Sequence, residues 1–201
     1  MNLVPSRPPR WILVAKVVLL GLLVVGALFP DVGGFAGKGM VYRLPLFMSP
    51  ALIAPLIWRR RRGTYPLGVD IALTLPFLLD TLANAVGLYD NFTRTDDVLH
   101  FVNWFILVGG LTISMLTNSS CRRAPTWLLW IAGTGIGAIV AIAWEAAEYY
   151  VAQSGVGGLS LTYGDTISDL LLSTTGGAFG ALTAMRLLRN GLSQSPLVGS
   201  S

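Results

Sequence analysis

The chain has 201 residues, of which 53% are hydrophobic and only 12% are charged. Soluble domains carry about 25% charged residues, so this composition excludes a protein surrounded by water on all sides. The formal net charge of +4 comes from short basic clusters between apolar runs, which excludes a continuous basic face for nucleic acid. These features predict one compact membrane domain.

Six apolar segments follow one another along the chain. Each is close to the 20 or so residues that a helix needs to cross a hydrocarbon core about 30 Å thick. They cover residues 11–29, 40–58, 65–88, 98–117, 126–151 and about 165–188. The first is longer than a typical signal-peptide core and five more follow it, so we expect it to be retained as a helix.

The predicted fold is therefore all-α, a polytopic membrane helix bundle of about six transmembrane helices. The six segments form one transmembrane domain, residues 1–190. The small and polar residues 191–201 are predicted to form a flexible tail.

The positive charges between the segments predict an orientation. If the amino terminus is cytoplasmic, ten arginines fall in cytoplasmic segments and only Lys38 and Arg94 fall outside. Cytoplasmic loops are enriched in lysine and arginine, and the arginine block 59–62 is most simply an orientation and lipid-headgroup anchor. We expect a multi-pass protein of a bacterial plasma (inner) membrane with both termini in the cytoplasm.

The acidic residues separate by depth in this topology. Nine of the ten lie toward the outer side, namely Asp31, Asp80, Asp90, Asp96, Asp97, Glu145, Glu148, Asp165 and Asp169. Only Asp70 lies near the inner end, where we expect it to be interfacial or paired with the arginine block. At about 1.5 Å of rise per residue, Asp80, His100, Glu145 and Asp169 lie roughly 5–12 Å inside the outer ends of four helices.

The spacing of these residues places them on shared helix faces, because residues three or four apart lie on one side of a helix. The groups are Asp80 with Asn84, Asp96 and Asp97 with His100, Glu145 with Glu148, and Asp165 with Asp169. A charged group that faces lipid costs several kcal/mol. We therefore expect the four polar faces to turn inward around one outward-opening cavity. Asp90 and Asp96 are interpreted as loop charges or helix caps.

Several carboxylates in one cavity need a compensating positive charge, because they repel one another and burial penalises their charge. A divalent metal, shared protons, or salt bridges to Arg43 and Arg94 would each provide compensation. Carboxylates and imidazole on facing helices suit Zn, Mn or Fe. The candidate metal ligands are Asp97, His100, Glu145, Glu148, Asp165 and Asp169, the candidate catalytic groups are His100, Glu145, Glu148 and Asp169, and Asp80, Asn84 and Tyr89 form a further polar group.

Small residues recur at helical spacing in the last segment, where Gly176, Gly177 and Gly180 are followed by Ala181 and Ala184. Small residues let helix backbones approach closely in membranes. We expect this face to pack tightly against another helix.

These motifs resemble the YjdF-like family of uncharacterised bacterial membrane proteins and, more distantly, the VanZ-like proteins linked to glycopeptide resistance. The matching pieces lie between about residues 70 and 185 and are Asp80-Thr-Leu-Ala-Asn84, Leu88-Tyr89-Asp90, Asp97-Val-Leu-His100-Phe101, Glu145-Ala-Ala-Glu148 and Tyr163-Gly-Asp165-Thr166-Ile-Ser-Asp169. The resemblance implies a helical membrane protein whose acidic and histidine motifs form the functional centre, and it names no substrate. The glutamate motif of VanZ-like proteins tends to end in glutamine, whereas here it ends in Glu148, which weakens any transfer of antibiotic resistance.

Three functions are consistent with the sequence. The first is a metal-assisted hydrolase or transferase that acts on a lipid-like or small-molecule substrate at the envelope side. The second is a proton-coupled transporter or permease, because intramembrane acids with His100 provide the groups of a proton relay. The third is a non-catalytic membrane scaffold in which the polar faces lock the helices together. The expected partner is the lipid bilayer and not nucleic acid, and the oligomeric state stays open.

Overall fold

The computed structural model describes residues 5–61, 63–117, 121, 123–155 and 161–193. Within these ranges all regular structure is helical, as the sequence predicts. The elements are α1 (Arg10–Leu28), the 3₁₀ turn η1 (Gly33–Phe35), α2 (Met40–Ala51), α3 (Ile53–Arg61), α4 (Leu67–Ala85), α5 (Leu88–Asn91), α6 (Thr95–Thr117), α8 (Thr126–Gln153) and α9 (Tyr163–Ser193).

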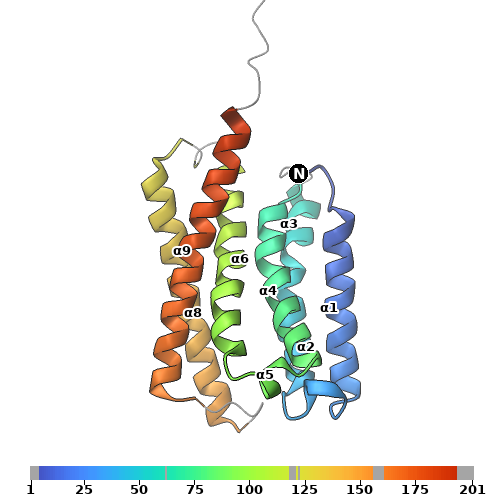
Figure 1. Cartoon of the computed structure of the whole chain (residues 1–201). Coiled ribbons are helices and arrows are strands. Elements are labelled where there is room, and N and C mark those ends of the chain that lie inside the picture. Colours follow the sequence, from blue (N-terminus) through green and yellow to red (C-terminus); the bar gives the residue numbers. More distant parts are fainter. Residues whose placement is uncertain (1–4, 62, 118–120, 122, 156–160, 194–201) are drawn as a thin grey trace, which may run out of the picture.

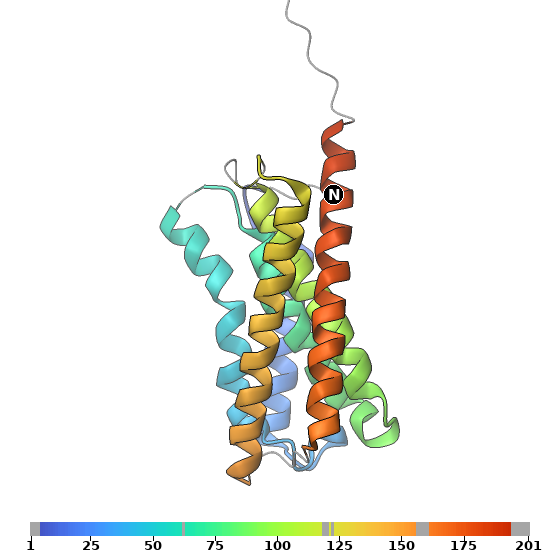
Figure 2. The same cartoon turned by 90° about the vertical axis from the view of Figure 1, so that its left-hand side faces the viewer.

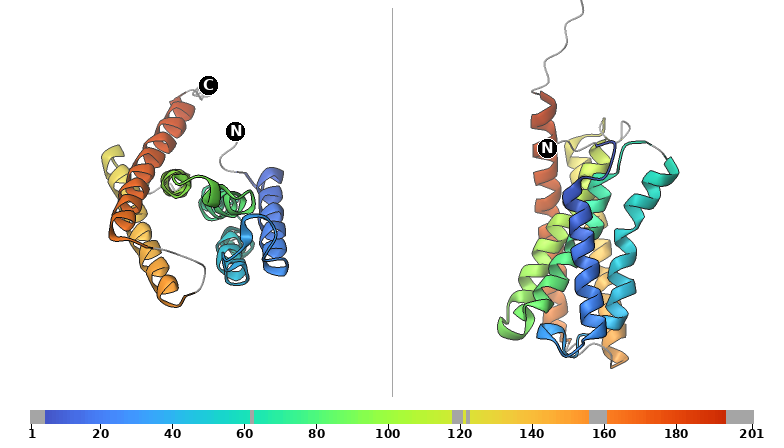
Figure 3. Two further views of the ribbon diagram at one scale, coloured as in Figure 1. Left: turned by 60° about the horizontal axis from the view of Figure 1, so that its bottom comes forward. Right: turned by 90° about the vertical axis from the view of Figure 1, so that its right-hand side faces the viewer.

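The long helices run along one common axis and form two groups (Figure 1). Helices α6, α8 and α9 pack together on one side, and α1, α2, α3 and α4 pack together on the other. The contact between α4 and α6 joins the two groups, and these two helices lie at the centre when the bundle is viewed obliquely toward its end (Figure 3).

Five helical segments are long and apolar enough to cross a membrane, within the part of the chain that the structure describes. They are α1, α2 together with α3, α4, α6 and α8. The prediction of a polytopic helical membrane protein is thereby confirmed. Helix α9 runs beside α6 and α8 (Figure 2), and its crossing of the membrane stays a prediction, as does the orientation. Because α9 continues to Ser193, it includes the start of the predicted tail; residues 194–201 lie outside the described residues.

We call the two ends of the bundle the acidic end and the basic end. The acidic end, at the bottom of Figure 1, holds the last turns of α1, α4 and α8 and the first turns of α2, α6 and α9. The basic end holds the arginines at the end of α3.

The second apolar segment of the sequence is interrupted between α2 and α3. A lysine from α1 supplies a hydrogen bond that the helix loses there. Pro55 in α3 has no backbone N–H, so the carbonyl of Ala51, four residues earlier, loses its ordinary helical donor. The Nζ atom of Lys16 lies 2.6 Å from that carbonyl oxygen and donates to it instead.

The same lysine forms a buried ion pair with α4, where its Nζ lies 2.6 Å from Oδ1 of Asp70. The hydroxyl of Tyr65 also donates to the Asp70 carboxylate, and Thr74 Oγ1 donates to it over 3.0 Å. Burial, together with the hydrogen bond and the charge of Asp70, raises the pKa of Tyr65 far above its ordinary value. Asp70 lies in the first turn of α4, near the basic end, but its side chain is fully buried and its cationic partner is Lys16 rather than the arginine block.

Glycines bring α9 against α6, which confirms the close packing predicted for the last segment. A Cβ atom on Gly176 would overlap the carbonyl oxygen of Phe101, and one on Gly180 would overlap that of Phe105. The two backbones approach so closely that only glycine fits at these positions. This contact fixes the height at which residues of α9 face those of α6.

Candidate functional site

His100 lies at the centre of the polar cluster near the acidic end. Its side chain is 5% exposed and stacks on Trp104, one turn further along α6, with ring centroids 5.5 Å apart. Its Nδ1 atom lies 3.0 Å from the hydroxyl of Ser173 on α9. The ring is therefore held on two sides, and its Nε2 atom is directed toward other partners.

Carboxylates from three helices surround this imidazole. The Nε2 atom lies 3.7 Å from an oxygen of Asp96 on α6 and 3.9 Å from an oxygen of Asp169 on α9. On the other side of the ring, Nδ1 lies 3.9 Å from an oxygen of Glu145 on α8. All three distances are longer than a hydrogen bond, so the carboxylates face the imidazole without bonding to it.

Two oxygens of these carboxylates are buried and lack a hydrogen bond from any residue that the structure describes, one of them facing the imidazole and the other on the far side of the Glu145 carboxylate from the atom that faces it. They are Oδ1 of Asp169 and Oε2 of Glu145, whose side chains are only 2% and 6% exposed. A buried carboxylate oxygen without a donor is costly unless a proton or a cation compensates it. Both oxygens therefore point to a positively charged ligand at this site.

The donor set fits a divalent metal. Asp96, His100 and Asp169 each offer one atom, and these atoms all lie within 4.8 Å of one another. Nitrogen and oxygen ligands bind Zn²⁺ at about 2.1 Å, so two ligands of one ion lie at most about 4.3 Å apart, and a small inward shift suffices. His100, Glu145 and Glu148 form a second such group, but it uses Nδ1, which already faces Ser173. Imidazole and carboxylate ligands suit Zn, Mn or Fe.

Two of the six candidate ligands lie outside both groups among the described residues. Asp97 accepts a 3.4 Å hydrogen bond from Ser168 and lies 3.9 Å from Arg94. Asp165 lies in the first turn of α9, one turn before Asp169, and its backbone N–H is bonded to the hydroxyl of Thr162.

Sequence reasoning left Asp96 out of the candidate ligands and interpreted it as a loop charge or a cap. The structure places Asp96 in the first turn of α6, on the face of His100. The signal was present in the sequence, because Asp96 precedes His100 by four residues and therefore shares its face.

The predicted group of Asp80, Asn84 and Tyr89 assembles next to this cluster, and Arg43 joins it. Oδ1 of Asp80 accepts a 2.6 Å hydrogen bond from the Tyr89 hydroxyl, and Oδ2 accepts one of 2.8 Å from Arg43 and one of 3.3 Å from Asn84. Burial, followed by the charge of Asp80, raises the pKa of Tyr89 far above its ordinary value. Tyr89 therefore stays a hydrogen-bond donor to Asp80.

Two adjoining cavities lead to these polar groups. The larger, which we call the central cavity, has a volume of about 170 Å³ and is lined by Asp80, Tyr89, Asp96, His100 and Glu148 among other residues. The smaller, which we call the lateral cavity, has a volume of about 100 Å³ and lies between α2 and α8. Phe47, Trp144 and Glu148 line both cavities.

The comparison with protein families agrees with this picture. A family model described as "Predicted membrane protein (DUF2238)" matches residues 11–190. The chain belongs to this family. It is the YjdF-like family that the sequence motifs resemble, so that prediction is confirmed, whereas the more distant likeness to VanZ-like proteins stays a prediction. No curated protein and no solved structure matches the chain.

Proposed function

We propose that this protein is a metal-dependent hydrolase or transferase that acts on an amphiphilic substrate at the outer face of a bacterial inner membrane. One observation carries the proposal. A buried histidine nitrogen faces two carboxylates, and the nearest oxygen of Asp169 has no hydrogen-bond donor among the described residues. Imidazole and carboxylate are ligand types of divalent metals. A buried carboxylate oxygen without a donor requires a compensating charge, which such a metal would provide.

In this proposal His100 Nε2, Asp96 and Asp169 hold the metal. Ser173 supports the assignment, because its hydroxyl lies 3.0 Å from the other imidazole nitrogen. A hydrogen bond at that nitrogen orients a histidine toward a metal, as in many metal sites. A metal held there supplies Lewis-acid polarisation of a carbonyl or phosphoryl oxygen.

Glu148 is the proposed acid–base group, because it lines both cavities and lies one helical turn from Glu145. In a hydrolysis, Glu148 takes a proton from the attacking water as the new bond to carbon or phosphorus forms. The bond to the leaving oxygen then breaks, and the proton passes to that oxygen.

The transport alternative has less support from the cavity. Away from the acidic end the central cavity is lined by Pro50, Leu73 and Leu107, which carry no ionisable group. A proton relay needs ionisable steps across the membrane, so this apolar lining favours an enzyme that opens to one side.

Element analysis of the purified full-length protein tests the proposal. We expect about one equivalent of a divalent metal, and we expect Asp96→Asn and His100→Ala to lower metal affinity by more than ~10-fold, the smallest loss usual even for supporting residues of metal sites. Asp97→Asn is the matched control, because it makes the same change one residue away and outside both ligand groups; it should keep the metal.

Two results would contradict the proposal: a wild-type protein without stoichiometric metal, or an Asp96→Asn variant with unchanged metal content. Thermal stability of each variant should be measured alongside. Variants that lose only stability would favour the scaffold, and pH-dependent solute flux in proteoliposomes that Glu148→Gln abolishes would favour the transporter.

A further inference from the structure

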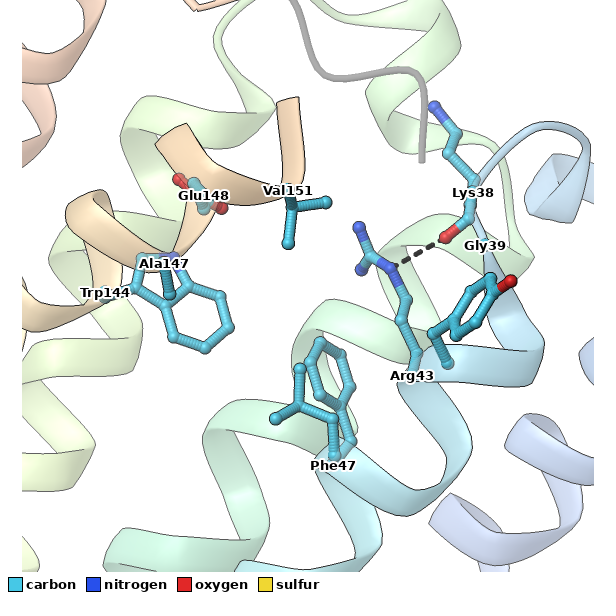
Figure 4. Close-up of a pocket in the computed structure, with 10 residues that line it drawn as sticks. Lys38, Gly39, Arg43, Phe47, Trp144, Ala147, Glu148 and Val151 are labelled. Carbon is cyan, nitrogen blue, oxygen red and sulfur yellow. Dashed lines mark hydrogen bonds between the residues drawn. The ribbon is translucent and has the colours of Figure 1, made fainter. Parts of the chain in front are cut away.

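The lateral cavity has no role in holding the proposed metal, and its walls come from two helices that face each other. Figure 4 shows Arg43 and Phe47 of α2 on one side and Ala147, Glu148 and Val151 of α8 on the other. The cavity adjoins the central cavity through their shared lining residues. A molecule that enters between α2 and α8 therefore reaches the cluster around His100.

The lateral cavity opens toward the bilayer. Tyr42 and Leu46 line it and are 65% and 56% exposed, and they belong to a segment that is apolar enough to cross a membrane. Exposed apolar side chains at this depth lie against lipid chains. The entrance is thus placed where a lipid can approach sideways, without leaving the membrane.

The size of the cavities restricts how much of a lipid they can hold. The lateral and central cavities measure about 100 and 170 Å³, and a cavity of roughly 150 Å³ holds one benzene molecule. A whole lipid does not fit. A head group, or a short part of one chain, fills this volume while the remaining chain stays in the bilayer.

Arg43 at the rim of the lateral cavity favours an anionic head group. Arg43 donates its Nε hydrogen to the carbonyl oxygen of Lys38 over 2.9 Å and an Nη1 hydrogen to Asp80 over 2.8 Å. A guanidinium has five N–H donors, so three remain, and Figure 4 shows this group directed into the space opposite α8. The Lys38 side chain extends away from this group (Figure 4), and its Nζ is held 2.8 Å from Asp90. Oriented arginine donors match phosphate oxygens in geometry and charge.

We propose that the lateral cavity is the entrance for a membrane lipid with a phosphate head group, whose phosphate binds Arg43 while its chain remains in the bilayer. This inference rests on the proposed function, because it makes that lipid the substrate of the metal site. Charge complementarity identifies the head group, and the opening toward the bilayer identifies a lipid rather than a free phosphate as its source.

Lipid retention by the detergent-purified protein tests the inference. The probes are dioleoyl phosphatidic acid, dioleoylglycerol and inorganic phosphate, with bound lipid counted by native mass spectrometry. We expect the protein to retain phosphatidic acid at least ~10-fold more strongly than dioleoylglycerol, the ratio given by one charge-assisted hydrogen bond of about 1.5 kcal/mol. Inorganic phosphate at equal concentration should not displace the lipid.

Two pairs of variants localise the binding. Ala147→Trp fills the lateral cavity and should reduce phosphatidic acid binding at least ~10-fold, while Ala146→Trp, an equally large change at an exposed neighbour outside the described cavity linings, should not. Arg43→Gln should remove the preference for phosphatidic acid over dioleoylglycerol, and Arg43→Lys should restore most of it by keeping the charge.

Equal retention of the two lipids by the wild-type protein, displacement by inorganic phosphate, or unchanged binding by Ala147→Trp would each overturn the inference. Metal content measured on the same samples separates this failure from that of the proposed function. Metal without lipid preference overturns the lipid entrance alone, and selective lipid binding without metal overturns the assignment of that lipid as a substrate.

Discussion

The amino group of Lys16 serves two partners, a backbone carbonyl freed by a proline and a buried carboxylate. It bonds the carbonyl oxygen of Ala51, which Pro55 cannot reach with a backbone N–H, and it neutralises the carboxylate of Asp70. Removing one member of a buried ion pair leaves the other charge without compensation. The three helices α1, α2 and α4 therefore depend on this one side chain.

Asp70→Asn should destabilise the protein by roughly 3–5 kcal/mol, the usual cost of breaking a buried ion pair on one side. The measurement is thermal unfolding of the purified protein in detergent. Asp31→Asn is the control, because Asp31 is an exposed residue in the turn after α1. The double variant Lys16→Met with Asp70→Asn should lose less than the sum of the two single variants, because the pair is coupled. Equal melting temperatures for Asp70→Asn and Asp31→Asn would contradict the assignment.

The sequence predicted that acidic residues and a histidine form the site, but it did not predict every member of the site correctly. His100, Glu145, Glu148 and Asp169 do converge, as the spacing of the polar residues indicates. Asp96 and Asp97 lie four and three residues before His100 and point about 100° apart, so the rotation of α6 about its axis decides which of them turns with His100 toward Asp169 of α9. Packing sets that rotation, and the sequence alone does not contain it.

The contact between α6 and α9 determines the register of the site, because α6 carries His100 and α9 carries Asp169. Close approach at Gly176 and Gly180 fixes the relative height of these two helices. A change in that contact should therefore act on the proposed metal site as well as on stability.

Gly176→Ala should lower stability by about 1–3 kcal/mol, the usual cost of overpacking a tight contact, and should weaken metal binding by separating Asp169 from His100. Gly21→Ala in α1 is the matched control, because a Cβ atom at Gly21 meets no atom within 4 Å among the described residues. That variant should be neutral or slightly stabilising, since alanine favours a helix over glycine by about 1 kcal/mol. Thermal unfolding and element analysis check both effects, and a Gly176→Ala protein with wild-type stability would refute the close contact.

The sequence predicted the long helices well because sustained apolar character identifies them. It did not predict the break between α2 and α3, although Pro45, Pro50 and Pro55 lie in that segment. Transmembrane helices tolerate proline where a neighbouring group satisfies the freed carbonyl. Here that group is Lys16, which lies on another helix, so the break depends on a contact between distant parts of the chain.

At the scale of the whole molecule, one end of the bundle is acidic and the other is basic, which predicts a single orientation in the membrane. The arginines in the last turn of α3 favour a cytoplasmic position for the basic end of the bundle. The acidic end, with the candidate site, then faces the outside. This orientation decides which lipid leaflet supplies the proposed substrate.

Cysteine labelling in intact cells tests the orientation. In a Cys121→Ser background, Asp31→Cys at the acidic end should react with a membrane-impermeant maleimide, and Thr64→Cys at the basic end should not. Both positions are exposed turn residues, so burial does not separate them. After cell lysis both should react, and labelling of Thr64→Cys alone in intact cells would reverse the predicted topology.

The buried pair between Lys16 and Asp70 also bears on biosynthesis. A nascent chain delivers α1 before α4, so the ammonium group emerges well before its counter-charge is synthesised. Lys16 is the seventh of the 19 residues of α1, and a lysine costs up to about 3 kcal/mol on insertion by the translocon, the value at the helix centre. Release of α1 into the lipid as a lone helix is thus disfavoured, and α1 should remain beside the insertion machinery until α4 arrives to neutralise it.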